Sequence, residues 1–321
     1  MHMAMPSRKS STPRPYTPRS RGVPMLRRSR VQAIVLGLCA LATLLFTISH
    51  IFGSSESIPS GTPPVVIITV LDTDHYSKAY LDTIKQNRND YAKKHADLML
   101  MLCYLDYATF FPETTDYDLA GAPSSWSRVP AVRHALTKFP HSTWFWFLEQ
   151  NSLIMNPAMT VESSILDKVE GLMLKNHPVV PPDSVIKTFP HLKSHQVDLI
   201  VTQDNTGLAQ GSFILRRGEW SKFFLDTWFD PLYRSYNFQK ADAHALEHIV
   251  QWHPTILSKL VIIPQRTINA YIKGGPADES GLYKDGDFVI RFVGCETGGR
   301  DCIKEADQFS KQWRAVFDAR S

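Results

Sequence analysis

The chain of 321 residues is 43% hydrophobic, 11% aromatic and 21% charged, with four cysteines, which excludes a disordered chain, a collagen-like chain and a small fold built on disulfides. Its formal net charge is +4, but residues 1–30 contain eight Lys or Arg and no acidic residue, which leaves about −4 for the rest. The folded part is therefore slightly acidic, and nothing in its composition points to a nucleic-acid partner.

An apolar segment follows this basic tail. Residues 31–52 contain no Asp, Glu, Lys or Arg, and a helix of that length spans about 33 Å, enough to cross the core of a bilayer. The positive charges before it favour a cytoplasmic N-terminus. We therefore expect a cytoplasmic tail over 1–30, an uncleaved signal anchor over 31–52 and a Ser/Gly/Pro-rich stalk over 53–64, with a cleaved signal peptide as the alternative.

Residues 65–317 alternate short apolar runs with segments of helical spacing. The runs predict strands at 65–71, 98–104, 144–148, 199–202, 212–215, 260–263 and 288–292, and the spacing predicts helices at 75–95, 126–139, 218–229 and 241–252. This alternation indicates an α/β fold with a mostly parallel sheet flanked by helices. Ligands bind such sheets at the carboxyl ends of strands, so polar residues that follow the apolar runs are the candidates for chemistry.

Three cysteines lie in this body. Cys103 falls in an apolar run and is expected to be a buried thiol. Cys295 and Cys302, separated by six residues in a Gly-rich segment, could form a disulfide if the body lies on the far side of the membrane, in the secretory pathway.

The most informative segment is WFWFLEQNSLIMNP at 144–157, where Glu149, Gln150 and Asn151 follow the most aromatic predicted strand. Together with five further motifs it resembles glycosyltransferase family 34, the galactosyl/mannosyl transferase family. The five are NRNDYAKKHAD (87–97), WSRVPAVRHAL (126–136), QDNTGLAQGSFILRR (203–217), DAHALEHIVQ (242–251) and VIRFVGCETGGRDC (289–302). The resemblance covers about residues 65–313 and is most similar to fungal α-1,6-mannosyltransferase subunits of the mannan polymerase type.

This resemblance implies a GT-A-like, Rossmann-like fold in a single-pass type II protein of the Golgi membrane, with a luminal domain over 65–317. It also implies retaining transfer of mannose from GDP-mannose to the mannan backbone of N-glycans, within a hetero-oligomer of related mannosyltransferase subunits. The choice of mannose rather than galactose comes from this likeness alone.

The resemblance also places a donor site at Glu149 and Asn151, which stand where the family has two Asp residues that hold Mn²⁺. Asn supplies only a neutral carbonyl oxygen. Arg291 stands where many members have a metal-ligating His, and a guanidinium has no lone pair for a metal. Two interpretations follow: Arg291 replaces the metal as the counter-charge of the donor diphosphate, or the subunit has lost catalysis and serves as a structural or acceptor-binding partner.

Further residues are carried over from the family pattern to the same site. Asp242 and Glu149 are the catalytic candidates; Arg291, Asn151, Gln150, Arg128, Thr69 and Asp72 are expected at the donor nucleotide and diphosphate, and Asp204, Asn205, Gly207 and Gly211 in the sugar or acceptor pocket. An ordinary turn at 204–207 and a solvated surface charge at Arg128 are the alternatives.

A rival from another class is His244-Ala245-Leu246-Glu247-His248. On a helix, His-x-x-Glu-His is the inverted zinc-protease signature, in which two His bind Zn²⁺ and the Glu acts as a base. Alone, it would predict a membrane-anchored metalloprotease, although the sequence places no third protein ligand.

Overall fold

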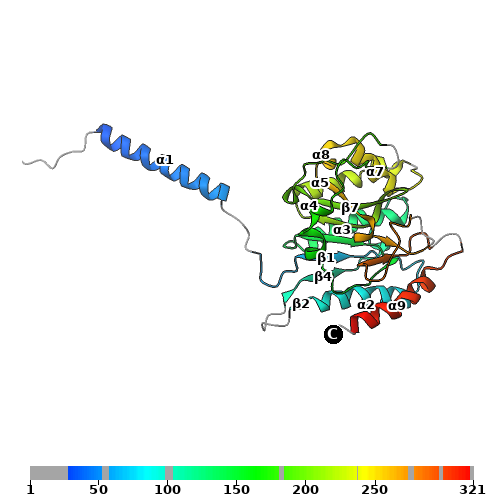
Figure 1. Ribbon diagram of the computed structural model, residues 1–321. Helices are drawn as coiled ribbons and strands as arrows, with labels where there is room; N and C mark the ends of the chain where they lie inside the picture. Colours follow the sequence, from blue (N-terminus) through cyan, green and yellow to red (C-terminus); the bar gives the residue numbers. More distant parts are fainter. Residues whose placement is uncertain are drawn as a thin grey trace, which may run out of the picture. The chain divides into compact units, whose positions relative to one another are not determined.

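The computed structural model describes residues 28–52, 58–97, 104–180, 184–236, 238–273, 278–295 and 299–318. The chain divides into two units, Met1–Ser57 and Ile58–Ser321. In the first, helix α1 (Arg28–Phe52) contains a stretch, Arg30–Thr47, that is long and apolar enough to cross a membrane (Figure 1). This helix corresponds to the predicted anchor.

The second unit is built on a six-stranded mixed sheet with the order β4-β1-β5-β8-β7-β9. The strands are β1 (Val65–Ile68), β4 (Tyr107–Phe110), β5 (Trp144–Leu148), β7 (Leu199–Asp204), β8 (Gly207–Arg216) and β9 (Leu260–Ile263). Strand β8 runs antiparallel to β5 and β7, whereas the other neighbours pair in parallel. The predicted α/β fold with flanking helices is confirmed.

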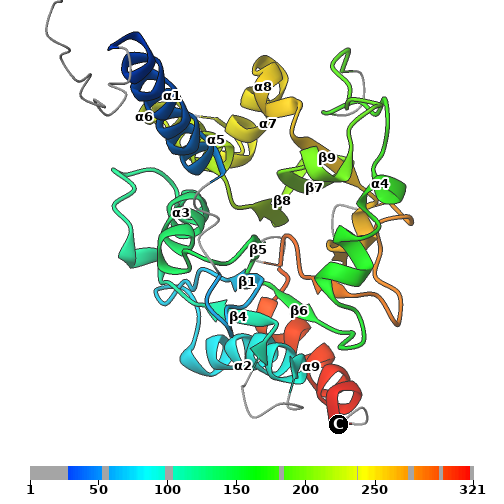
Figure 2. The same cartoon turned by 90° about the vertical axis from the view of Figure 1, so that its left-hand side faces the viewer.

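Helices cover both faces of this sheet because alternate strand residues point to opposite sides and both sides are apolar. The helices are α2 (Lys78–Lys94), α3 (Arg128–Lys138), α4 (Val169–Leu172), α5 (Glu219–Trp228), α6 (Pro231–Ser235), α7 (Asp242–Trp252), α8 (Pro254–Leu257) and α9 (Cys302–Asp318). One core, which includes Ile67 and Trp146, packs on α2 and α9. The other, which includes Ile68 and Phe147, packs on α3, α5, α7 and α8 (Figure 2).

A smaller sheet lies beside the main one and consists of β10 (Ala270–Tyr271), β11 (Val289–Arg291) and β6 (Ser152–Ile154). Its antiparallel β11–β6 pairing places Arg291 opposite Ser152, three residues after Glu149. A disulfide joins Cys295 to Cys302, so the loop that follows β11 is tied to the first residue of α9.

Several predicted elements differ from those observed. Residues 98–103 lie outside the described residues, and Tyr104–Leu105 (β3) pairs with Ala96–Asp97 (β2) in a separate two-stranded sheet, so the strand beside β1 is the unpredicted β4. Strand β8 begins at Gly207 rather than at residue 212. The predicted 288–292 strand is β11 of the smaller sheet, and α9 was not predicted.

Candidate active site

A cavity of about 800 Å³ lies at the edge of the main sheet where β5 and β7 end and the antiparallel β8 begins. Its wall includes Arg128, Glu149, Asn151, Asp204, Gly211, Asp242, Glu247, Tyr271 and Arg291. Helices α3 and α7, strand β8 and the smaller sheet each contribute side chains to it. The topology therefore gathers candidates from five of the six sequence motifs into one space.

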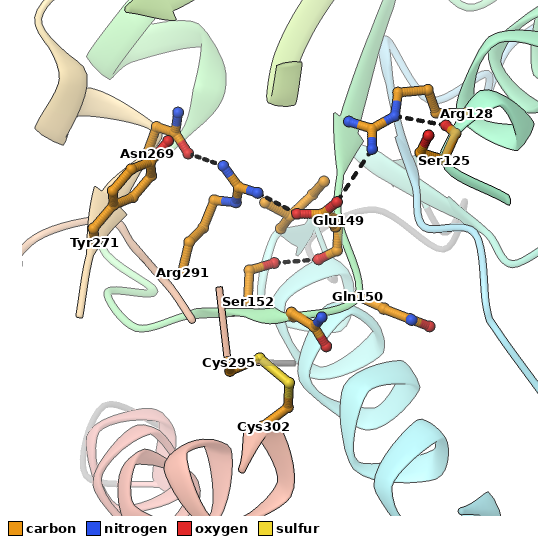
Figure 3. Close-up of polar contacts among 12 residues, drawn as sticks. Ser125, Arg128, Glu149, Gln150, Ser152, Asn269, Tyr271, Arg291, Cys295 and Cys302 are labelled. Atoms are coloured by element: carbon orange, nitrogen blue, oxygen red, sulfur yellow. Dashed lines mark hydrogen bonds and ion pairs between the residues drawn. A yellow bond between two sulfur atoms is a disulfide. The ribbon is translucent and has the colours of Figure 1, made fainter. Parts of the chain in front are cut away.

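Glu149 lies between two arginines in this cavity (Figure 3). Its Oε1 accepts a hydrogen bond from Arg128 Nη2 at 3.3 Å, and its Oε2 accepts one from Arg291 Nη2. Burial by itself raises the pKa of Glu149, but the two guanidinium groups outweigh burial and hold it below its ordinary value. Glu149 is therefore an ionised carboxylate at neutral pH.

Arg128 is fixed in place at the start of α3. Its Nε donates to the Ser125 carbonyl at 2.9 Å and lies 3.0 Å from Asp242 Oδ2, while its guanidinium lies 5.5 Å from the Phe147 ring centroid. Only 6% of Arg128 and 1% of Asp242 are exposed. Arg128 is thus a buried, ion-paired side chain, and its alternative interpretation as a solvated surface charge is wrong.

Arg291 is held on the opposite side of Glu149. Its Nη1 donates to Asn269 Oδ1 at 2.6 Å, and Asn269 in turn donates to Thr202 Oγ1 at 2.7 Å. The Tyr271 ring lies 5.6 Å from the guanidinium. Burial lowers the pKa of Arg291, but Glu149 raises it above its ordinary value, so the side chain stays cationic.

Each of these two arginines has a spare donor. Within the described part of the chain, Arg128 Nη1 and Arg291 Nε are buried and have no hydrogen-bond partner. A buried N–H without a partner costs roughly 1–3 kcal/mol, and both arginines line the cavity. The site therefore suits a ligand with several negatively charged oxygens.

The residues carried over as metal ligands do not fit Mn²⁺. Both carboxylate oxygens of Glu149 face arginines, and the Asn151 amide accepts from Tyr80 at 2.9 Å and donates to Tyr76 at 2.9 Å. Arg291 cannot ligate a cation. Across the described ranges, no group of three or more His, Cys, Asp or Glu residues could hold a metal ion.

Of the predicted nucleotide contacts, Gln150 and Asp72 line a cavity, whereas Thr69 is fully buried. Gln150 Oε1 accepts from the Asp72 backbone N–H at 2.8 Å, and both residues line a small cavity of about 140 Å³ next to the main one. Asp72 also lines a third cavity of about 490 Å³. Thr69 has no exposed surface, and its hydroxyl donates to the Leu148 carbonyl at 2.8 Å, so it braces β1 against the end of β5.

The predicted sugar residues belong to the β7–β8 hairpin and to β8 itself. Asp204 Oδ1 accepts from the Gly207 N–H at 3.1 Å, as in an ordinary turn, while its Oδ2 accepts from Tyr271 at 2.8 Å. Asp204 lines the main cavity, whereas Asn205 is exposed and lines a different cavity of about 540 Å³. Gly211 lies within β8, not in a loop, and lines the main cavity.

The zinc-protease motif does not form a metal site. His244 Nδ1 accepts from the Lys240 backbone N–H at 3.4 Å, and the His248 ring lies among the rings of Tyr233, Phe238 and Trp252. Glu247 Oε1 accepts from the Leu208 N–H at 3.1 Å. The three residues therefore have separate structural partners.

The side chains that support this site from behind were not predicted from the sequence. Arg88 of α2 has no exposed surface and donates to the carbonyls of Glu149 at 3.0 Å and Ser152 at 2.7 Å. Asn87 holds Ile154 through two hydrogen bonds of 2.9 and 2.8 Å. Asn87 and Arg88 belong to the 87–97 motif, but the motif did not indicate what they do. No pattern in the sequence pointed to Asn269.

Comparisons with known proteins identify the family of this chain. Residues 61–302 match the model of the galactosyl transferase GMA12/MNN10 family. The chain is 32% identical over 235 residues to the probable α-1,6-mannosyltransferase MNN10 of Saccharomyces cerevisiae, which covers 70% of this chain and 58% of that protein. It is 27% identical over 268 residues to an uncharacterized α-1,2-galactosyltransferase of Schizosaccharomyces pombe, which covers 80% and 77%.

Among solved structures, the chain is similar to a glycosyltransferase involved in the glycosylation of the major capsid of PBCV-1. The TM-score is 0.49 at 14% identity, over 78% of this chain and 99% of that one. The family match covers well over half of the chain and includes Glu149, Asp242 and Arg291. The chain therefore belongs to the galactosyl transferase GMA12/MNN10 family and is a glycosyltransferase.

Proposed function

We propose that this glycosyltransferase transfers mannose from GDP-mannose to α-1,6-linked mannan on N-glycans, with retention of configuration. Arg128 and Arg291 would bind the donor diphosphate where other family members use a metal ion. The observation that carries this proposal is the pair of buried guanidinium groups on either side of Glu149, each with an N–H group that lacks a partner among the described residues.

Where β5 ends, the buried charges favour an anion, although the cavity lining as a whole contains three cationic and four acidic side chains. Arg88, Arg128 and Arg291 are buried cations, and Glu149 and Asp242 are the carboxylates in direct contact with two of them. The surplus positive charge lies directly behind and beside the end of β5. Because Arg128 and Arg291 are buried, charge-assisted hydrogen bonds from them to phosphate are stronger than in water.

These arginines would also promote the transfer itself. As the bond between the anomeric carbon and the diphosphate breaks, negative charge grows on the departing GDP, and fixed guanidinium donors stabilise that charge. In a front-side displacement, the acceptor oxygen bonds to the anomeric carbon and its proton passes to the departing diphosphate oxygen, so no covalent nucleophile is needed. Asp242 is 1% exposed and lines the cavity. It would orient the sugar by accepting hydrogen bonds from the hydroxyl groups of the sugar.

The cavities also suggest a path for the nucleotide. The small cavity shares Arg128, Glu149 and Asn151 with the main one, and it shares Asp72 with the third. We place the nucleoside along this path, over Gln150 and Asp72, and the hexose in the main cavity. The hydrogen bond from the Asp72 backbone N–H to Gln150 joins the first strand's end, where the nucleoside would lie, to the end of β5, where the diphosphate would lie.

Cellular placement is part of the proposal. The helix α1 and its basic N-terminal tail suit a single-pass anchor with the second unit in the Golgi lumen. The likeness to MNN10 suggests assembly with related mannosyltransferase subunits. Protease protection of the second unit in intact Golgi vesicles, together with its loss on detergent treatment, would test the orientation.

The decisive experiment uses the full chain in detergent with GDP-mannose or UDP-galactose, α-1,6-mannobiose as acceptor, and either EDTA or Mn²⁺. We expect GDP-mannose turnover that persists in EDTA and falls by at least tenfold in Arg291→Lys, because lysine keeps the charge but loses the forked donor geometry. Arg133→Lys, on the exposed side of α3, is the matched control.

Three outcomes would contradict parts of this proposal. Turnover that requires Mn²⁺ would contradict the arginine site, and preference for UDP-galactose would contradict the donor. Turnover seen only when a related active subunit is added, and unchanged by Glu149→Ala, would favour the alternative role as a structural or acceptor-binding subunit.

A further inference from the structure

Glu247 is a further carboxylate of the main cavity, besides Glu149, Asp204 and Asp242, and it takes no part in the transfer proposed above. It lies on α7, is 7% exposed and lines the cavity together with Glu149 and Arg291. Its Oε1 accepts from the Leu208 N–H at the start of β8. The carboxylate is thus held against the β7–β8 hairpin and at the cavity wall.

The hairpin is shaped around this carboxylate. Gly207 has φ +142°, and a Cβ built on it would lie 1.7 Å from Glu247 Oε1. Any other residue at this position would displace the carboxylate and strain the backbone. A glycine that leaves room for a buried acid next to a cavity indicates that the acid has a use there.

Glu247 lies at the end of the cavity away from the arginines. Gly207, against which Glu247 packs, and Gly211, against which Arg291 packs, are four residues apart on β8, or about 13 Å along an extended strand. The wall between them is Leu208, Ala209 and Gln210, which carry no charge. The cavity therefore has Arg128 and Arg291, paired with Glu149 and Asp242, toward one end, and Glu247 with Lys240 toward the other.

We propose that Glu247 binds hydroxyl groups of the hexose that lies next to the diphosphate end of the cavity. This inference rests on the proposed function, because it assumes a sugar nucleotide at Arg128 and Arg291. A carboxylate accepts hydrogen bonds from two neighbouring sugar hydroxyls, and hydrogen bonds to charged groups are among the strong ones. The same chemistry serves the donor hexose or the terminal mannose of the acceptor.

The surroundings of Glu247 support a ligand-binding carboxylate. Burial raises its pKa, while Lys240 and the Leu208 N–H lower it and Asp204 raises it. Lys240 itself donates to the Thr206 carbonyl in the hairpin. A buried acid with a perturbed pKa in a cleft is typical of functional sites.

Calorimetric titration of the full chain in detergent with GDP, GDP-mannose and α-1,6-mannobiose tests this role. In Glu247→Gln we expect the affinity for GDP to stay within twofold of wild type. We expect the affinity for either GDP-mannose or mannobiose to fall about tenfold or more. Loss of the extra affinity of GDP-mannose over GDP assigns Glu247 to the donor hexose. Loss of mannobiose affinity assigns it to the acceptor. Glu219→Gln, on the exposed surface of α5, is the matched control.

The remaining outcomes overturn the inference. Unchanged affinity for GDP-mannose and mannobiose in a folded Glu247→Gln protein overturns the role of Glu247 alone. A wild-type chain that binds neither GDP nor GDP-mannose overturns the proposed function and this inference with it. If Glu247→Gln does not fold, Glu247→Asp, which keeps the charge but withdraws it by one methylene, is tested under the same criteria.

Discussion

The guanidinium of Arg291 lies where a side chain on Gly211 would be. A Cβ built on Gly211 would sit 1.8 Å from Arg291 Nη2 and 2.2 Å from its Cζ. The Gly211 carbonyl also accepts the backbone N–H of Glu149 at 2.8 Å. Gly211, Arg291 and Glu149 therefore form one packed unit in which the glycine is required by the arginine.

Gly211→Ala should displace Arg291 from Glu149. We expect GDP affinity to fall about tenfold, because one strong charge-assisted contact is lost. Calorimetric titration with GDP measures the effect. Gly218→Ala is the control, since a Cβ there meets nothing within 4 Å. Wild-type GDP affinity in Gly211→Ala would show that Arg291 does not bind the diphosphate.

Arg88→Met should destabilise the fold from beneath the site. The Ser152 carbonyl would lose a donor, at about 1–3 kcal/mol, whereas the Glu149 carbonyl would keep the Ser152 hydroxyl as a donor. We therefore expect the free energy of unfolding to fall by about 1–3 kcal/mol. Urea denaturation measures it, with the exposed Lys93→Met on the same helix as control.

An opposing effect makes this prediction informative. Burial lowers the pKa of Arg88 to about 9, which shows that the cation is costly to bury. Replacing a buried charge by an apolar side chain is often neutral. Equal stability of Arg88→Met and Lys93→Met would therefore mean that the burial cost cancels the contribution of the four hydrogen bonds that Arg88 donates.

Elements with continuous apolar runs could be predicted from the sequence. Strands β5 (WFWFL) and β9 (LVII) appear at the predicted bounds because each is an unbroken apolar run, buried on both faces except at Trp144. Strand β4 (YATF) was missed because it is a short edge strand with two half-buried residues and no run of that kind. Helix α9 was missed although its buried residues recur at helical spacing.

Strand ends and the family resemblance located candidate residues of the site, but not the contacts between them. Glu149 was found because a polar residue directly follows an apolar run. The contact of Arg291 with Glu149 spans 142 residues, and that of Asn269 with Thr202 spans 67. Periodicity reports which face a residue shares with its own element, not which distant side chain meets it, so these pairings required the tertiary structure.

Glu149→Gln should destabilise the protein in a pH-dependent way. Because its folded pKa lies below the ordinary 4.5, ionised Glu149 contributes stability that is fully present above pH 4.5 and is lost as pH falls through the folded pKa. We expect Glu149→Gln to be up to about 3 kcal/mol less stable at pH 7, since one partner of a buried ion-pair network is removed.

Urea denaturation between pH 3.5 and 7.5 measures this difference, with the exposed Glu279→Gln as control. The deficit of Glu149→Gln should shrink as the pH falls below 4.5, because the unfolded wild-type chain then takes up a proton at Glu149 that the folded chain takes up only at lower pH. A deficit that stays constant over this range would mean that the charge of Glu149 does not stabilise the fold.

Glu247→Gln should show the opposite pH dependence. Burial raises the folded pKa of Glu247 above the ordinary 4.5, so the unfolded chain ionises first as pH rises. The unfolded state then binds fewer protons than the folded state, and wild-type stability falls between pH 4.5 and the folded pKa. Glutamine has no such loss. Relative to wild type, Glu247→Gln should therefore be more stable at pH 7.5 than at pH 4.

The same urea series measures this change, and Glu279→Gln again gives the baseline for an exposed carboxylate. The sign separates two views of Glu247. If Glu247 serves the fold, its substitution should lower the stability of the protein at neutral pH. If it serves a ligand, the buried carboxylate destabilises the free protein, and ligand binding offsets that cost. A Glu247→Gln protein whose stability relative to wild type falls as the pH rises would contradict the second view.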